Sequence, residues 1–206
     1  MRAAAAWVVA VSMIVAAWWI AGATPDGEQR MLDPFPVRAT WGQTVEADNL
    51  GVTVHGARLA DRVATGGWSA DGRWLVVDLD AWIVRREPAA LGLAYLLVGD
   101  RTFLASERVA DYDADASLGG WGLHAGIPQT GTLVFELPED ITDDPAAAGA
   151  VLQLALGRPL AGRSPQQNQQ GGTVVEIPVD LTAVAHQDLI DLGTTTWTDD
   201  PDGASS

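Results

Sequence analysis

Cysteine and lysine are both absent from the 206 residues. Without cysteine the chain can form no disulfide, no thiolate zinc site, no cysteine nucleophile and no lipidated-cysteine anchor. All 12 basic residues are arginine, and they stand against 27 acidic residues, for a formal net charge of −15. This charge repels phosphate backbones, so nucleic-acid binding has no electrostatic support, and it also disfavours binding to anionic surfaces.

Charge is also missing from one long run near the start, residues 3–23. A helix of this length spans roughly 30 Å, the thickness of a hydrocarbon core. Arg2 precedes the run and Asp26 follows it, so the positive-inside rule predicts a single-pass anchor with the N-terminus inside. Ala21-Gly22-Ala23 also fits a cleavage pattern, and secretion after cleavage near Ala23 is the alternative. Both interpretations place the remainder outside the cytoplasm.

Three further segments follow the apolar run. Residues 24–44 contain Pro25, Pro34 and Pro36 without periodicity, which predicts an extended linker. Residues 45–184 are long enough for one domain with its own core. For residues 185–206 we expect a short helix over AHQDLIDLG and then a disordered acidic tail.

The stretch 73–84, RWLVVDLDAWIV, is the predicted central strand of that domain. Its alternation places Leu75, Val77, Leu79, Ala81 and Ile83 on one face, and this period of two with β-branched and aromatic residues is typical of a half-buried strand. The opposite face, which carries Trp74, Val76, Asp78, Asp80 and Trp82, is expected to meet solvent.

Other strands are predicted from similar patterns, at 49–60, 93–98, 102–109, 132–137, 151–156 and 173–181. Residues 64–72 are a predicted loop that ends in the turn pair Asp71-Gly72. Pro178 places the strand at 173–181 at a sheet edge. About seven short strands with glycine-rich connections predict an all-β fold, an immunoglobulin-like antiparallel β-sandwich preceded by one N-terminal transmembrane helix.

The segments GVTVHGARLA, RWLVVDLDAWI and AGIPQTGTLVFELP, in this order, resemble the telokin-like, immunoglobulin-like domains of exported bacterial proteins of unknown function. The lysine-free composition, rich in Ala, Gly, Asp and Arg, resembles that of GC-rich actinobacteria. The resemblance covers about two thirds of the chain and implies an extracytoplasmic, tethered domain. It supplies no catalytic residues, and fold likeness alone does not establish function.

Three alternating aspartates, Asp111, Asp113 and Asp115, form the densest acidic cluster. Such a loop can offer several oxygen ligands to calcium, which makes a Ca²⁺ site one hypothesis. Ala116 and Gly122 stand where an EF-hand loop needs glycine and glutamate, so we expect a solvated acidic loop, with the Ca²⁺ site as the alternative.

Trp68 and Trp121 lie in predicted glycine-rich loops, where flat apolar rings can contact sugar faces or a partner protein. A role in binding cell-wall polysaccharide would require both rings to be exposed on one rim of the domain.

No catalytic motif is present. The histidines His55, His124 and His186 are scattered along the chain, and no serine lies in a nucleophile-elbow sequence. Asp78 and Asp80 would lie about 7 Å apart on a strand face, a separation that glycosidases use, but we expect them to form the solvent face of the central strand instead. The sequence therefore predicts a non-enzymatic, cofactor-free accessory or interaction module of the cell envelope with a protein partner. A module that binds cell-wall polysaccharide through tryptophans is the alternative, and a hydrolase is a third class.

Overall fold

The computed structural model describes residues 13–15, 34–85, 89–120, 122–169 and 172–197. The chain divides into two units, Met1–Asp33 and Pro34–Ser206. Within the described residues, no helix has both the length and the apolar character needed to cross a membrane. The predicted membrane segment 3–23 lies outside the described residues except for 13–15, which are helical.

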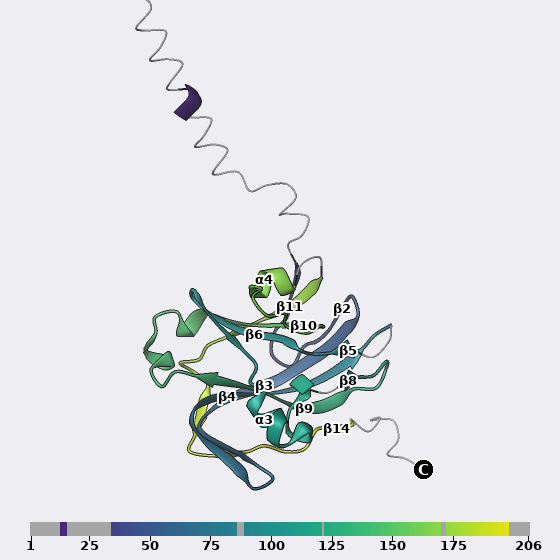
Figure 1. The fold of residues 1–206 in the computed structure, drawn as a ribbon, viewed down its shortest axis with the longest axis vertical. Coiled ribbons are helices and arrows are strands. Elements are labelled where there is room, and N and C mark those ends of the chain that lie inside the picture. Colours follow the sequence, from purple (N-terminus) through teal and green to yellow (C-terminus); the bar gives the residue numbers. More distant parts are fainter. Residues whose placement is uncertain (1–12, 16–33, 86–88, 121, 170–171, 198–206) are drawn as a thin grey trace, which may run out of the picture. The chain divides into compact units, whose positions relative to one another are not determined.

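The second unit consists mainly of two β-sheets (Figure 1). The five-stranded sheet has the order β1-β11-β10-β6-β7, and the seven-stranded sheet has β12-β3-β4-β9-β14 as its main path, with β2 and β13 also paired to β3. The first sheet contains β1 (Phe35–Arg38), β6 (Leu93–Val98), β7 (Arg101–Leu104), β10 (Ala150–Ala155) and β11 (Thr173–Val179). The second contains β2 (Thr44–Ala47), β3 (Leu50–Thr65), β4 (Trp68–Ile83), β9 (Gln129–Leu137), β12 (Ala185–Gln187), β13 (Ile190–Asp191) and β14 (Thr196–Trp197).

Short elements complete the unit. A two-stranded pair joins β5 (Ala89–Ala90) to β8 (Gly122–Leu123). The helices are α3 (Arg108–Tyr112) and α4 (Pro165–Asn168), with 3₁₀ turns η1 (Ala114–Ala116), η2 (Leu118–Gly120), η3 (Ile141–Asp143) and η4 (Ala147–Gly149). Most strand pairs are antiparallel, but β1 runs parallel to β11, and β12 and β13 run parallel to β3.

The main core contains apolar side chains from both sheets. Leu75, Leu79 and Phe135 from the larger sheet join Leu96 and Leu152 from the smaller one in a single cluster, each fully buried. All five residues predicted on the inner face of the central strand belong to this cluster. The two-sheet, sandwich-like architecture and the inner face of β4 are therefore confirmed.

The outer face of β4 is less exposed than we predicted. Trp74 and Val76 are fully buried in a second cluster, which also contains Val109 of α3, Ile190 of β13 and Leu192. The prediction that this face meets solvent is therefore wrong for Trp74 and Val76, because α3 and the C-terminal segment cover them. Removing such large apolar surfaces from water stabilises the fold.

Further along the same face, Asp78 and Asp80 of β4 are partly buried and paired. Arg58 of β3 donates two hydrogen bonds to Asp78, at 2.8 and 3.2 Å. Asp80 lies 2.8 Å from His55 and accepts a 2.6 Å hydrogen bond from Thr130. These carboxylates therefore tie β3, β4 and β9 together.

The predicted loop 64–72 is largely strand. β3 and β4 form one long hairpin that pairs as far as Thr65 and Trp68. Gly66 and Gly67 both have positive φ, 53° and 91°, which is the conformation that a two-residue type I′ turn requires. The turn therefore forms at Gly-Gly, and Asp71-Gly72 lies within β4.

Four other predictions differ from the structure. The strand predicted at 102–109 is too long, because β7 ends at Leu104 and α3 begins at Arg108. The linker predicted for 24–44 already contains β1, and its last residue begins β2. The helix predicted over AHQDLIDLG is wrong, because β12 and β13 pair with β3 there. β11 is second from the edge, although β1 covers only Thr173–Glu176 and leaves Pro178 beyond its reach.

Candidate functional site

Trp68 is the first residue of β4 rather than a loop residue. Its half-buried ring stacks on Tyr112, with ring centroids 4.9 Å apart and planes inclined by 22°. Tyr112 is 67 % exposed, so the stacked pair presents an aromatic surface to solvent. Trp121 lies outside the described residues, and its place on the same rim stays a prediction.

The three aspartates of the acidic cluster have different surroundings. Asp111 is exposed on α3, whereas Asp113 accepts a 2.7 Å hydrogen bond from the hydroxyl of buried Thr65 and a 3.1 Å bond from the amide of Asp115. Asp113 therefore holds η1 against the hairpin tip. In the segments that the structure describes, no three His, Cys, Asp or Glu side chains are grouped to hold a metal ion.

Replacing Asp113 with alanine is expected to lower the free energy of unfolding by about 1–2 kcal/mol, because the cap and the partner of buried Thr65 are both lost. Asp111→Ala, an exposed neighbour, should change it by less than about 0.5 kcal/mol. Urea unfolding with and without Ca²⁺ checks both statements. A calcium-dependent rise in the midpoint that Asp113→Ala abolishes would instead support the calcium hypothesis.

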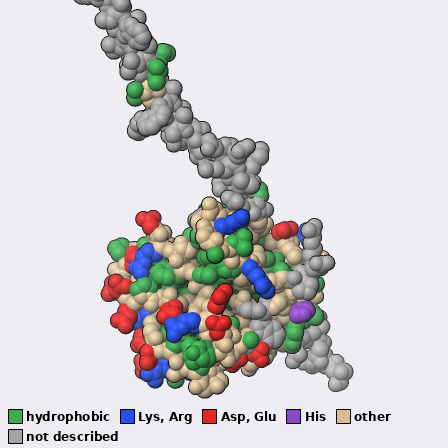
Figure 2. All heavy atoms as spheres, in the orientation of Figure 1, with side chains coloured by type: hydrophobic (Ala, Val, Ile, Leu, Met, Phe, Trp, Pro, Cys, Tyr) green, Lys and Arg blue, Asp and Glu red, His purple; other side chains and the backbone are tan. Residues whose placement is uncertain are grey.

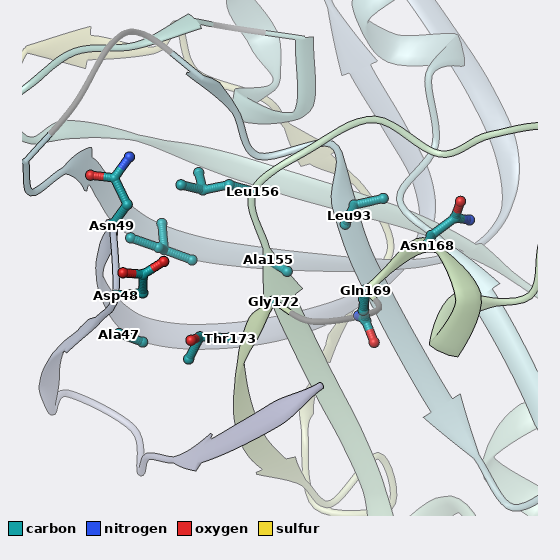
Figure 3. Close-up of a pocket in the computed structure, with 11 residues that line it drawn as sticks. Ala47, Asp48, Asn49, Leu93, Ala155, Leu156, Asn168, Gln169, Gly172 and Thr173 are labelled. Atoms are coloured by element: carbon teal, nitrogen blue, oxygen red, sulfur yellow. The ribbon is translucent and has the colours of Figure 1, made fainter. Parts of the chain in front are cut away.

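A cleft of about 190 Å³ lies where the β2–β3 turn of the larger sheet approaches the smaller sheet. Figure 3 shows Ala47, Asp48 and Asn49 on one side and Leu93, Asn168 and Gln169 on the other, with Ala155 and Gly172 between them. Leu50, Leu156 and Thr173 complete the lining. The cleft therefore combines an apolar floor with several amide, hydroxyl and carboxylate groups, as ligand-binding clefts commonly do.

Local structure fixes the side of the cleft that α4 forms. Ser164 and Gln167 make a reciprocal capping box at the start of α4, with Pro165 at its first position. Asn168 accepts a 3.0 Å hydrogen bond from the amide of Leu160 and donates a 3.1 Å bond to the hydroxyl of Tyr95. Both functional groups of Asn168 are engaged, so this residue holds α4 on β6.

The opposite side is a two-residue turn between β2 and β3. Ala47 pairs with Leu50, and Asp48 at the first turn position has φ of 53°. Asn49 accepts a 2.9 Å hydrogen bond from the amide of Arg85, which fixes the turn against the end of β4. Asp48 itself is exposed at the rim.

Sequence reasoning missed this cleft. Its lining comes from four separate parts of the chain, near residues 48, 93, 156 and 170, and contains no motif. The available signal was Asp48-Asn49 between two alternating segments, which is typical of a tight turn.

Two other cavities have less distinctive linings. One of about 260 Å³ lies beside α3 and includes Leu104 and Asp111, and one of about 180 Å³ lies beside Arg58 and Asp78. In the second of these cavities, three polar lining residues are already paired. Arg58 binds Asp78, and Thr132 donates a hydrogen bond to the carbonyl of Ala116.

No protein-family model and no curated protein matches the chain. The immunoglobulin-like family membership expected from the sequence therefore stays a prediction.

Some solved structures are similar to the chain at low sequence identity and low TM-score. The yjhA protein of Bacillus subtilis is 14 % identical, with a TM-score of 0.43 over 68 % of this chain and 97 % of its own. A candidate lipoprotein from Staphylococcus aureus is 9 % identical, with a TM-score of 0.44 over 73 % and 96 %. An uncharacterised β-sandwich protein from Clostridium difficile is 6 % identical, with a TM-score of 0.42 over 71 % and 95 %. At these values no functional conclusion is transferred.

Proposed function

We propose that this chain is a non-enzymatic interaction module of the bacterial cell envelope, an immunoglobulin-like sandwich tethered to the outer side of the cytoplasmic membrane by residues 3–23. The single observation that carries the binding role is the cleft between the β2–β3 turn and α4. It has an apolar floor and polar groups at both sides (Figure 3). Such a site binds a segment of another molecule without any chemical step.

The tether limits where that molecule can be. Residues 24–34 can span at most about 35–40 Å when fully extended. The cleft is close to the entry of the chain into the domain, because the amide of Phe35 donates to the carbonyl of Gly172 in the cleft lining. The proposed partner is therefore a protein in, or held at, the same membrane.

Photo-crosslinking tests this proposal. The chain has no cysteine, so Thr173→Cys in the cleft can be labelled uniquely with a benzophenone maleimide. Ser69→Cys, beside the aromatic pair, is the matched control. Amine-reactive reagents are unsuitable because the chain has no lysine.

We expect the probe at residue 173, irradiated in native membranes, to form an adduct with one membrane protein, identified by mass spectrometry. The probe at residue 69 should not form that adduct. If residue 173 gives no protein adduct, the proposed role of the cleft is wrong.

Wall-polysaccharide binding is a second candidate function, favoured by the stacked Trp68–Tyr112 pair. Exposed aromatic faces pack against the apolar faces of sugar rings. If this function holds, Tyr112→Ala should reduce sedimentation with purified cell wall at least about fivefold, whereas a change in the cleft should not. If the unaltered protein and Tyr112→Ala sedimented equally with the cell wall, polysaccharide binding by this pair would be eliminated.

A further inference from the structure

Gln169 is the only residue of the cleft whose side chain is both buried and, within the described part of the chain, short of a hydrogen-bond partner. It is 3 % exposed, and its Nε2 atom has no acceptor there. Leaving a buried amide donor unpaired is unfavourable, so native proteins nearly always satisfy such groups. A ligand with an oxygen acceptor that reaches Nε2 would satisfy this donor.

Asp48 offers the complementary group on the other side of the cleft (Figure 3). Its carboxylate makes no hydrogen bond or ion pair with any residue that the structure describes. Other aspartates nearer the middle of the larger sheet, such as Asp78 and Asp80, are paired with Arg58 and His55. Asp48 is thus available to a cation.

Apolar side chains lie between these two groups. Leu50, Leu93 and Ala155 are each at most 4 % exposed and form the floor. The volume of about 190 Å³ is below the roughly 300–1,000 Å³ of pockets for drug-sized molecules. The space suits one long side chain and its own backbone rather than a cofactor.

We infer that the cleft binds an extended segment of the partner protein through one lysine or arginine, whose cation pairs with Asp48 while a nearby backbone carbonyl accepts a hydrogen bond from Gln169 Nε2. The methylene stem of the basic side chain lies along the apolar floor, as such stems do on apolar surfaces. This inference rests on the proposed function, because it names the chemistry of the segment bound in the same cleft.

Charge complementarity favours a basic partner over the other ligand classes. The formal net charge is −15, and Figure 2 shows acidic side chains mostly toward the left and the lower part of the domain, with arginines among them. An anionic ligand would be repelled by this charge and by Asp48. A neutral sugar could satisfy Gln169 but would leave Asp48 without a counter-charge.

Peptide binding to the full-length protein in lipid nanodiscs tests the inference. The probes are fluorescent, N-acetylated nine-residue alanine-rich peptides with lysine, arginine, norleucine or glutamate at the centre, measured by anisotropy up to millimolar concentration. We expect lysine and arginine to bind at least about fivefold tighter than norleucine, and 0.5 M NaCl to remove most of this difference.

Two variants separate the two contacts. Asp48→Asn should reduce lysine-peptide affinity to that of the norleucine peptide, and asparagine tolerates the positive φ at this turn. Gln169→Leu should weaken lysine and norleucine peptides by the same factor, because it removes only the contact with the backbone. Asp188→Asn is the control, because it changes the net charge equally but lies away from the cleft. It stands between β12 and β13, which pair with the part of β3 from Arg58 to Ala64, whereas the cleft lies at Leu50.

The inference is overturned if lysine and norleucine peptides bind equally, if none binds, if Asp48→Asn changes nothing, or if glucosamine oligomers bind the cleft in place of peptides. These failures are distinct from failure of the proposed function. If the adduct at residue 173 persists unchanged in Asp48→Asn, the cleft still binds a partner but the pairing of a basic side chain with Asp48 is wrong. If no adduct forms at all, the proposed function of the cleft is wrong.

Discussion

Replacing Phe135 with alanine is expected to lower the free energy of unfolding by about 3–5 kcal/mol, the usual cost of deleting a buried aromatic ring. Phe135 lies in β9 opposite Leu75 of β4 and is fully buried between the two sheets. The strands on both sides are fixed by their ladders, so the vacated space cannot close easily.

Urea unfolding followed by tryptophan fluorescence measures this cost. Ile127→Ala is the control, because Ile127 is 47 % exposed and should contribute less than about 0.5 kcal/mol. A loss below about 1 kcal/mol for Phe135→Ala would contradict the position of the core between the sheets.

Gly51→Ala is expected to destabilise the fold by about 1–3 kcal/mol, the cost of overpacking a fixed site. Gly51 in β3 pairs directly with Trp82 in β4, and a Cβ atom at residue 51 would overlap the indole ring. The ring lies over the glycine backbone and leaves no room for a methyl group.

Gly56→Ala in the same strand is the matched control, since a Cβ atom there would meet nothing within 4 Å. The double variant Gly51→Ala with Trp82→Ala should lose less stability than the sum of the single variants, because removing the ring relieves the overlap. Strict additivity in urea unfolding would contradict the contact.

The sequence predicted the inner face of the central strand because burial there depends on a local alternation. Five aliphatic side chains recur at every second residue, and a sheet with one buried face requires that pattern. The burial of Trp74 on the other face depends on Val109 and Ile190, which are distant along the chain. A local pattern carries no information about such cover.

The turn and the C-terminal segment show the same limit. Gly66-Gly67 and Asp71-Gly72 are both plausible turn pairs, and only the pairing of Thr65 with Trp68 decides between them. Leu189, Ile190 and Leu192 fit part of a helical pattern, yet the segment pairs with β3 and buries Ile190 and Leu192. Tertiary contacts determine the outcome in both cases.

The candidate site was the least predictable part. Trp68 is close to a partner ring, but that ring belongs to Tyr112 rather than to a second tryptophan. The cleft depends on how the β2–β3 turn and α4 approach one another across the two sheets. No periodicity or spacing in the sequence predicts that the β2–β3 turn and α4 lie close together.

Intact-mass analysis of the photo-crosslinked chain recovered from native membranes tests the central claim, a tethered module that engages its partner through the cleft. We predict a chain that begins at Met1 and is joined through residue 173 to one membrane protein. A chain that begins at Thr24 and carries no protein adduct would contradict both the tether and the role of the cleft.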